Sequence, residues 1–66
     1  MKRKELIHQL VASGCTLHRH GSRHDVYLNP RNGNKQPVPR HAEIHDKLAR
    51  HIMKHLGLLE KPENED

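Results

Sequence analysis

The sequence predicts an α+β domain with the element order α-β-β-β-α, in which two helices cover one face of a three-stranded antiparallel sheet. Three observations lead to this fold class. Apolar residues recur at helical spacing near both ends of the chain, alternating residues fill the middle, and turn-forming Gly, Pro and Asn separate the alternating runs. Two helices that remove water from one face of such a sheet form a stable pair of layers.

Residues 2–13 are predicted to form the first helix, and Gly14 follows as a natural helix stop. The apolar residues of this segment fall on one stripe of a 3.6-residue period, namely Leu6, Ile7, Leu10 and Val11. The first turn carries three cations, Lys2, Arg3 and Lys4, where the helix dipole disfavours positive charge. A nearby anion would relieve this repulsion, but ordinary fraying at a chain terminus explains it as well.

Residues 15–20 and 23–28 alternate as two strands of a hairpin, with Gly21-Ser22 as its two-residue loop. This register pairs Leu17 with Val26 and Cys15 with Leu28. We expect these four residues to form the apolar face of the hairpin.

The same register has two further consequences for the hairpin. It places Arg19 opposite His24 on the apolar face, at the turn end where the cover by the helices stops. It turns Tyr27 to the other face, together with Asp25, so that a surface or partner contact is expected for the tyrosine ring.

A third strand is predicted over residues 35–39, and its prolines, Pro37 and Pro39, mark it as an edge strand. A three-residue loop over residues 31–33, with Gly33 left-handed, would pair Val38 with Val26 and bring Arg40 beside His24. A two-residue loop over residues 32–33 would move Val38 to the opposite face. We favour the first because it keeps Val38 on the apolar face.

The second helix is predicted over residues 43–56, with Gly57 as its stop. Its apolar stripe is Ile44, Leu48, Ile52 and Leu56. Leu58 and Leu59 could fold back onto the core. The prediction is therefore a single domain over residues 1–59, followed by an acidic and flexible C-terminal tail over residues 60–66.

Composition narrows the classes of function. The formal net charge of +4 favours a polyanionic partner, although a charged surface alone would explain it as well. Apolar residues are sparse, so a deep pocket for a hydrophobic ligand is not expected, and no apolar run approaches the length of a membrane span. The single Cys15 excludes an internal disulfide. We expect a soluble protein of the cytoplasm.

Three fragments in this order resemble the HicA toxins of bacterial HicAB toxin–antitoxin pairs. They are Gly21-Ser22-x-His24, then Val38-Pro39-Arg40-His41, then a helix that ends in residues 52–58. The resemblance spans nearly the whole chain. It implies a fold similar to double-stranded-RNA-binding domains, cleavage of single-stranded mRNA, and neutralisation by a HicB-type antitoxin. It also implies that His24 is the catalytic histidine and that Gly21 and Ser22 position it.

RNA supplies its own nucleophile, the 2′-hydroxyl, so cleavage requires only a base, a cation for the phosphorane and an acid for the leaving oxygen. We therefore expect no metal and no small-molecule cofactor. Histidine is the side chain whose unperturbed pKa lies near neutrality, and His24 is assigned as base or acid. The residues expected to bind RNA or its phosphates are Arg19, Ser22, Arg23, Lys35, Arg40 and His41. His41 could instead be the second proton-transfer group or begin the last helix.

Two other readings use the same residues. Without the resemblance, His24 would be interpreted as a hydrogen-bonded histidine of a hairpin. A separate alternative is an RNA-binding module that keeps the same fold but does not cut RNA. Alternatively, two histidine pairs at i, i+4 spacing, His41/His45 and His51/His55, could chelate a metal ion. No carboxylate or Cys cluster completes a tetrahedral site, so metal binding is the weaker alternative.

Overall fold

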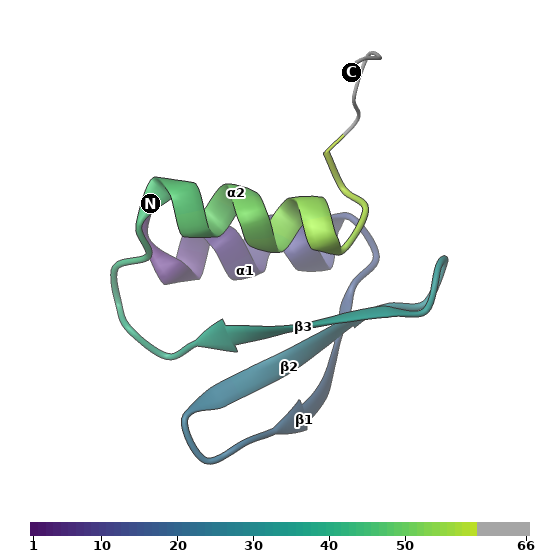
Figure 1. Cartoon of the computed structure of the whole chain (residues 1–66), viewed down its shortest axis with the longest axis horizontal. Coiled ribbons are helices and arrows are strands. Elements are labelled where there is room, and N and C mark those ends of the chain that lie inside the picture. The colour runs from purple at the N-terminus through teal and green to yellow at the C-terminus, as the bar shows by residue number, and fades with distance from the viewer. Residues whose placement is uncertain (60–66) are drawn as a thin grey trace.

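The computed structural model describes residues 1–59, and its elements follow the predicted order (Figure 1). They are α1 Arg3–Ala12, β1 Thr16–His20, β2 His24–Asn29, β3 Asn34–Pro39 and α2 Asp46–His55. The strands form one antiparallel sheet in the order β1-β2-β3, with both helices on the same side of it (Figure 1). The α+β prediction is confirmed, whereas the predicted acidic tail over residues 60–66 lies outside the described residues.

Both helices end where the sequence predicts. Gly14 has φ +97° and Gly57 has φ +76°, backbone values that glycine adopts without a steric penalty. The second helix begins later than predicted, at Asp46, because residues 42–45 instead run alongside the start of α1. There the Arg3 N–H donates to the Ala42 carbonyl at 2.9 Å, which joins the beginnings of the two helices. None of the helices within residues 1–59 has the length and apolar character required to cross a membrane.

The core lies between the helices and the sheet. It consists of nine buried apolar residues: Leu6, Leu10, Cys15, Tyr27, Val38, Ile44, Ala49, Ile52 and Leu56. Leu58 packs against this cluster, as predicted, whereas Leu59 is exposed. Two stripe predictions are wrong, because Val11 and Leu48 are exposed. On α2, Ala49 is buried in the core next to the exposed Leu48.

The predicted register of the first hairpin is wrong. The loop is Ser22-Arg23 rather than Gly21-Ser22, so that His20 pairs with Asp25 and Arg19 pairs with Val26. A β-bulge then shifts the register between Leu17 and Arg19, and Leu17 pairs with Tyr27. Because side chains alternate between faces, the inner face of β2 carries residues 25, 27 and 29 instead of the predicted apolar set.

Tyr27 is therefore a core residue, 8% exposed, and the prediction of a surface contact for its ring is wrong. Val26 and Leu28 point to the outer face of the sheet, where they are half-buried. Leu17, predicted to be in the core, is exposed at the edge strand β1. The prediction failed because β2 buries the polar Asp25 and Asn29 and turns the apolar Val26 and Leu28 outward, which is the opposite of what the alternation of apolar residues indicates.

The second hairpin also differs from its prediction. Four residues, 30–33, connect β2 to β3, with Gly33 at φ +76°, and Val38 pairs with Asp25 instead of Val26. Val38 is nevertheless fully buried, because the face that β2 turns towards the helices has changed as well. β3 is an edge strand, as its two prolines predicted.

Asparagine side chains from this second hairpin satisfy backbone carbonyls at the end of α2. The Asn29 amide donates to the Leu56 carbonyl at 2.7 Å and is buried, and the Asn32 amide donates to the same carbonyl at 3.2 Å. The Asn34 amide donates to the His55 carbonyl at 3.0 Å. The last carbonyls of a helix have no partner within the helix, so these bonds fix α2 on the sheet.

Candidate functional site

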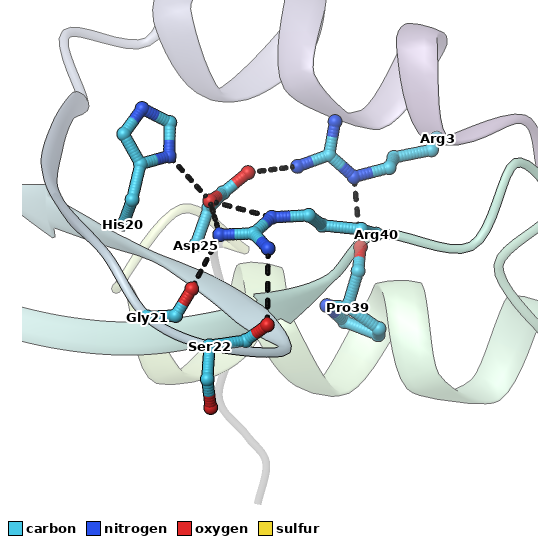
Figure 2. A network of polar contacts seen from close by, with 7 residues as sticks. All are labelled: Arg3, His20, Gly21, Ser22, Asp25, Pro39 and Arg40. Atoms are coloured by element: carbon cyan, nitrogen blue, oxygen red, sulfur yellow. Dashed lines mark hydrogen bonds and ion pairs between the residues drawn. The ribbon is translucent and has the colours of Figure 1, made fainter.

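A buried carboxylate organises the end of the sheet at which the first hairpin turns. The Asp25 side chain is only 9% exposed, and three cationic or titratable side chains donate to it (Figure 2). Arg3 Nη2 reaches Oδ2 at 2.7 Å, while Arg40 contacts Oδ1 through Nε at 2.9 Å and through Nη2 at 2.8 Å. His20 Nδ1 lies 2.7 Å from the same Oδ1.

These contacts determine the charge state of the carboxylate. The hydrogen bonds from Arg40 and then His20 hold the pKa of Asp25 far below its usual range, against the opposing effect of burial. In return, the carboxylate raises the pKa of the Arg40 guanidinium. Asp25 is therefore ionised at neutral pH. The Asp25 carboxylate also lies beside Arg3, at the N-terminus of α1. It is therefore an anion that relieves the repulsion predicted between the helix dipole and the cations of the first turn.

Arg40 connects this carboxylate to the hairpin turn. Its Nη2 donates to the Gly21 carbonyl at 2.5 Å and its Nη1 to the Ser22 carbonyl at 3.3 Å (Figure 2). With the two bonds to Asp25, four of the roughly five N–H groups of a guanidinium are engaged. Arg40 is thus held rigidly against the turn and retains a single N–H on Nη1 for a phosphate oxygen.

His24 lies on the other side of the same turn. It is the first residue of β2, it pairs with Pro39, and its side chain is exposed on the outer face of the sheet. The Gly21 N–H donates to the His24 carbonyl at 2.7 Å and closes the turn. A Cβ atom at position 21 would lie 2.8 Å from that carbonyl oxygen, so only glycine allows this close approach.

Three of the other predicted site residues lie close to this turn. Ser22 and Arg23 form its tip and are exposed, and Arg19 shares the outer face with His24 but pairs with Val26. The predicted opposition of Arg19 and His24 is therefore wrong, because the partner of Arg19 lies two residues further along β2. Together with His24, these three residues form one exposed surface around the turn, which we call the turn surface: Arg19, Ser22, Arg23 and His24.

Two predicted site residues are not part of the turn surface. Lys35 pairs with Leu28, four residues along β2 from His24, which corresponds to about 13 Å of strand. His41 is exposed in the segment between β3 and α2, and it does not begin the last helix as one of its readings proposed. Neither is brought next to His24 by the pairing of the strands.

Sequence reasoning missed the residues that hold the turn in place, namely Asp25, Arg3 and His20. Asp25 gives one local signal, because a carboxylate within an otherwise apolar strand needs a partner if that position is buried. Its two arginine partners lie 22 and 15 positions away in the chain, and only the folded sheet brings them together. No pattern in the sequence identifies them.

The histidine pairs proposed for metal binding remain on the surface. The rings of His51 and His55 have centroids 4.2 Å apart on α2. Within the part of the chain that the structure describes, no group of three or more His, Cys, Asp or Glu side chains is arranged to hold a metal ion.

Comparison with known proteins identifies one family. The family model of the HicA toxin of bacterial toxin–antitoxin systems matches residues 3–58, which include all five elements of the fold. No curated protein and no solved structure matches the chain.

Proposed function

Because this chain belongs to the HicA toxin family, and is thus the toxin of a toxin–antitoxin pair, we propose that it is an endoribonuclease that cuts mRNA without a metal ion. One observation carries the proposal. His24 is an exposed histidine at a turn whose backbone is fixed by Gly21 and Arg40. A titratable group held in this way can take up and return protons at neutral pH.

The chemistry follows from the substrate. His24 removes the proton of a 2′-hydroxyl, whose oxygen attacks the adjacent phosphorus. Arg19, Arg23 and the remaining N–H of Arg40 bind the phosphate oxygens as negative charge develops on them. The bond from phosphorus to the 5′-oxygen breaks and this oxygen takes a proton from solvent, so that the products are a 2′,3′-cyclic phosphate and a free 5′-hydroxyl. Lys35 and His41 are assigned to the flanking RNA backbone, because the pairing of the strands does not place either of them next to His24.

Cleavage of single-stranded RNA in excess EDTA tests this function. We expect His24→Ala to lower the cleavage rate by roughly 10²–10⁴-fold, the usual contribution of a general base. The matched control is His18→Ala, since His18 is also an exposed histidine of the same hairpin. Circular dichroism verifies that all three proteins are folded.

The outcomes separate the competing functions. Equal cleavage by the native chain and His24→Ala would refute the catalytic assignment. Binding of RNA by both proteins without any cleavage would identify a binding module instead.

The antitoxin partner of this toxin is proposed to be of the HicB type and to cover the turn surface. A net charge of +4 and three exposed polar or cationic neighbours of His24 suit an acidic protein surface as well as RNA. We expect one equivalent of such an antitoxin to abolish RNA cleavage, and Arg23→Glu to weaken the complex measured by calorimetry. Lys54→Glu on α2 is the control with the same change of charge, and an equal effect of both would refute this placement.

A further inference from the structure

The outer face of the sheet carries apolar side chains that the core does not use. Both helices pack on the other side of the sheet, so no helix within residues 1–59 covers this face (Figure 1). Val26 and Leu28 lie at its centre and are half-buried, but they belong neither to the core cluster nor to the residues packed against it. Their partners on β3, Pro37 and Lys35, are exposed on the same face.

The charged residues of this face are all cationic. Arg19 pairs with Val26 from β1, Lys35 pairs with Leu28 from β3, and both cations are exposed. The acidic residues of the described chain lie on the inner face of the sheet or in and beside the helices: Asp25, Glu5, Glu43 and Asp46. The outer face therefore attracts an anionic partner without a competing carboxylate nearby.

His24 lies at one end of this face. Side chains alternate along β2, so His24, Val26 and Leu28 all point to the same side of the sheet. Arg19 is reached about 7 Å along the strand from His24, and Lys35 about 13 Å along it. One ligand can therefore contact His24 and both cations without crossing the backbone. We call this surface the outer strip: Arg19, His24, Val26, Leu28, Lys35 and Pro37.

We propose that the outer strip binds the single-stranded RNA that flanks the cleaved linkage, and that Lys35 binds a phosphate of this flanking segment. The inference rests on the proposed ribonuclease function. A single strand offers phosphates to the two cations and unpaired bases and riboses to the apolar centre. A duplex turns its base faces inward and presents its phosphates, so it would leave Val26 and Leu28 without a partner.

The dimensions and the chemistry of the outer strip limit what it can recognise. A stacked strand advances about 3.4 Å per nucleotide, so about 13 Å of strip holds no more than about four nucleotides. Valine, leucine and proline side chains form no hydrogen bonds with base edges. The strip should therefore distinguish single strands from duplexes without selecting a base sequence.

An RNA that cannot be cut separates this binding from catalysis. The probe is a fluorescent single strand with 2′-O-methyl groups throughout, which removes the nucleophile, and the same strand annealed to its complement is the duplex control. Fluorescence anisotropy at several salt concentrations gives the affinity and its dependence on salt. Circular dichroism verifies the fold of each variant.

We expect the native chain to bind the single strand more tightly than the duplex. Lys35→Ala should reduce the slope of log K against log salt by about 0.7, the contribution of one phosphate contact in a single strand. Lys54→Ala removes an exposed lysine of α2 and should leave the slope unchanged. Val26→Thr should weaken binding by up to about fourfold at an unchanged slope, because apolar contact equivalent to one methyl group is lost.

A cleavable RNA connects the outer strip to the reaction. Lys35→Ala should raise KM and leave kcat unchanged, because Lys35 binds a flanking phosphate and not the reacting one. A lower kcat at unchanged KM would contradict this position of the RNA.

Several binding results would overturn the inference. Failure of the native chain to bind the probe, equal affinity for single strand and duplex, or equal changes of slope in Lys35→Ala and Lys54→Ala would place the RNA elsewhere. Weaker antitoxin binding by Lys35→Ala with unchanged RNA binding would assign the strip to the antitoxin. A chain that binds the probe as expected but cuts no RNA would refute the ribonuclease function and still support the strip as an RNA-binding surface.

Discussion

Asp25 contributes to the fold through its charge, because its carboxylate is nearly covered and accepts hydrogen bonds from Arg3, His20 and Arg40. Replacing one of these three partners would leave the buried Asp25 carboxylate with fewer hydrogen bonds. This change should lower the free energy of unfolding by more than the loss of one bond between exposed side chains. The network also holds the turn through the Gly21 and Ser22 carbonyls. A single residue therefore links stability to the geometry of the candidate site.

Acid should destabilise the fold through this residue. The pKa of Asp25 is lower in the folded chain than in the unfolded chain, so its ionised form stabilises the fold at pH values above about 4 and this contribution disappears as the pH falls. We expect the free energy of unfolding of the native chain to decrease between about pH 5 and about pH 2. Asp25→Asn should be less stable at pH 7 but lose less stability over that range.

Urea denaturation followed by circular dichroism measures both effects. Glu5→Gln serves as the control, because Glu5 is an exposed acid on α1. An acid dependence of Asp25→Asn as steep as that of the native chain would show that other carboxylates cause the loss of stability.

At the scale of elements, the connection between β2 and β3 holds α2 in place as well as turning the chain. Three asparagine amides from this hairpin, those of Asn29, Asn32 and Asn34, donate to carbonyls of Leu56 and His55. Asn29 is buried and its own side-chain oxygen accepts the Arg31 N–H at 3.1 Å, so both ends of its amide are used. Asn34 makes a comparable bond at the surface, where water can replace it.

We expect Asn29→Ala to lower the free energy of unfolding by about 1–3 kcal/mol, since buried groups are left without partners. Asn34→Ala should cost less than about 1 kcal/mol because its site is exposed to solvent. Chemical denaturation of the two variants in parallel provides the measurement. Equal losses would mean that the position of the bond at the end of α2, rather than its burial, determines its contribution.

At the scale of the whole molecule, a small number of buried side chains holds the layers together. A chain of this size buries only about 60% of the surface that it exposes when unfolded. The core is limited to nine apolar residues within residues 1–59, so each one carries a large share of the stability.

Two neighbours on α1 provide a matched test of this small core. Leu10 is fully buried, whereas Val11 is 56% exposed, although the helical pattern of the sequence assigned both to the core. We expect Leu10→Ala to cost about 2–5 kcal/mol, enough to unfold much of a marginally stable domain, and Val11→Ala less than about 0.5 kcal/mol. Thermal denaturation compares them. Similar melting temperatures of the two variants would contradict the packing of α1.

The order of the elements and the glycine stops could be predicted from the sequence, because they depend on local periodicity and on backbone conformations that glycine favours. The register of the first hairpin could not. Asp25 and Asn29 are polar and buried, while Val26 is apolar and lies on the outer face, which reverses the usual preference. This reversal is stable because Asp25 accepts hydrogen bonds from two arginines and the Asn29 amide donates to a carbonyl at the end of α2.

The same limit applies to the site. The position of His24 at the hairpin turn could be predicted from Gly21-Ser22, since turn residues are a local signal. The placement of His20 beside Asp25 depends on a loop formed by Ser22-Arg23 rather than Gly21-Ser22, and alternation does not distinguish these two loops. Contacts between residues far apart in the chain therefore account for most of what sequence reasoning missed.

The two edges of the sheet differ in their capacity to recruit further strands. Pro37 and Pro39 lack backbone N–H groups at alternate positions of β3, so a strand laid beside that edge would find few donors. β1, at the other edge, contains no proline and keeps its donors. Growth by edge-to-edge addition requires two open sides on every molecule. Association through strands should therefore stop at pairs, and the fold has a built-in protection against fibrils.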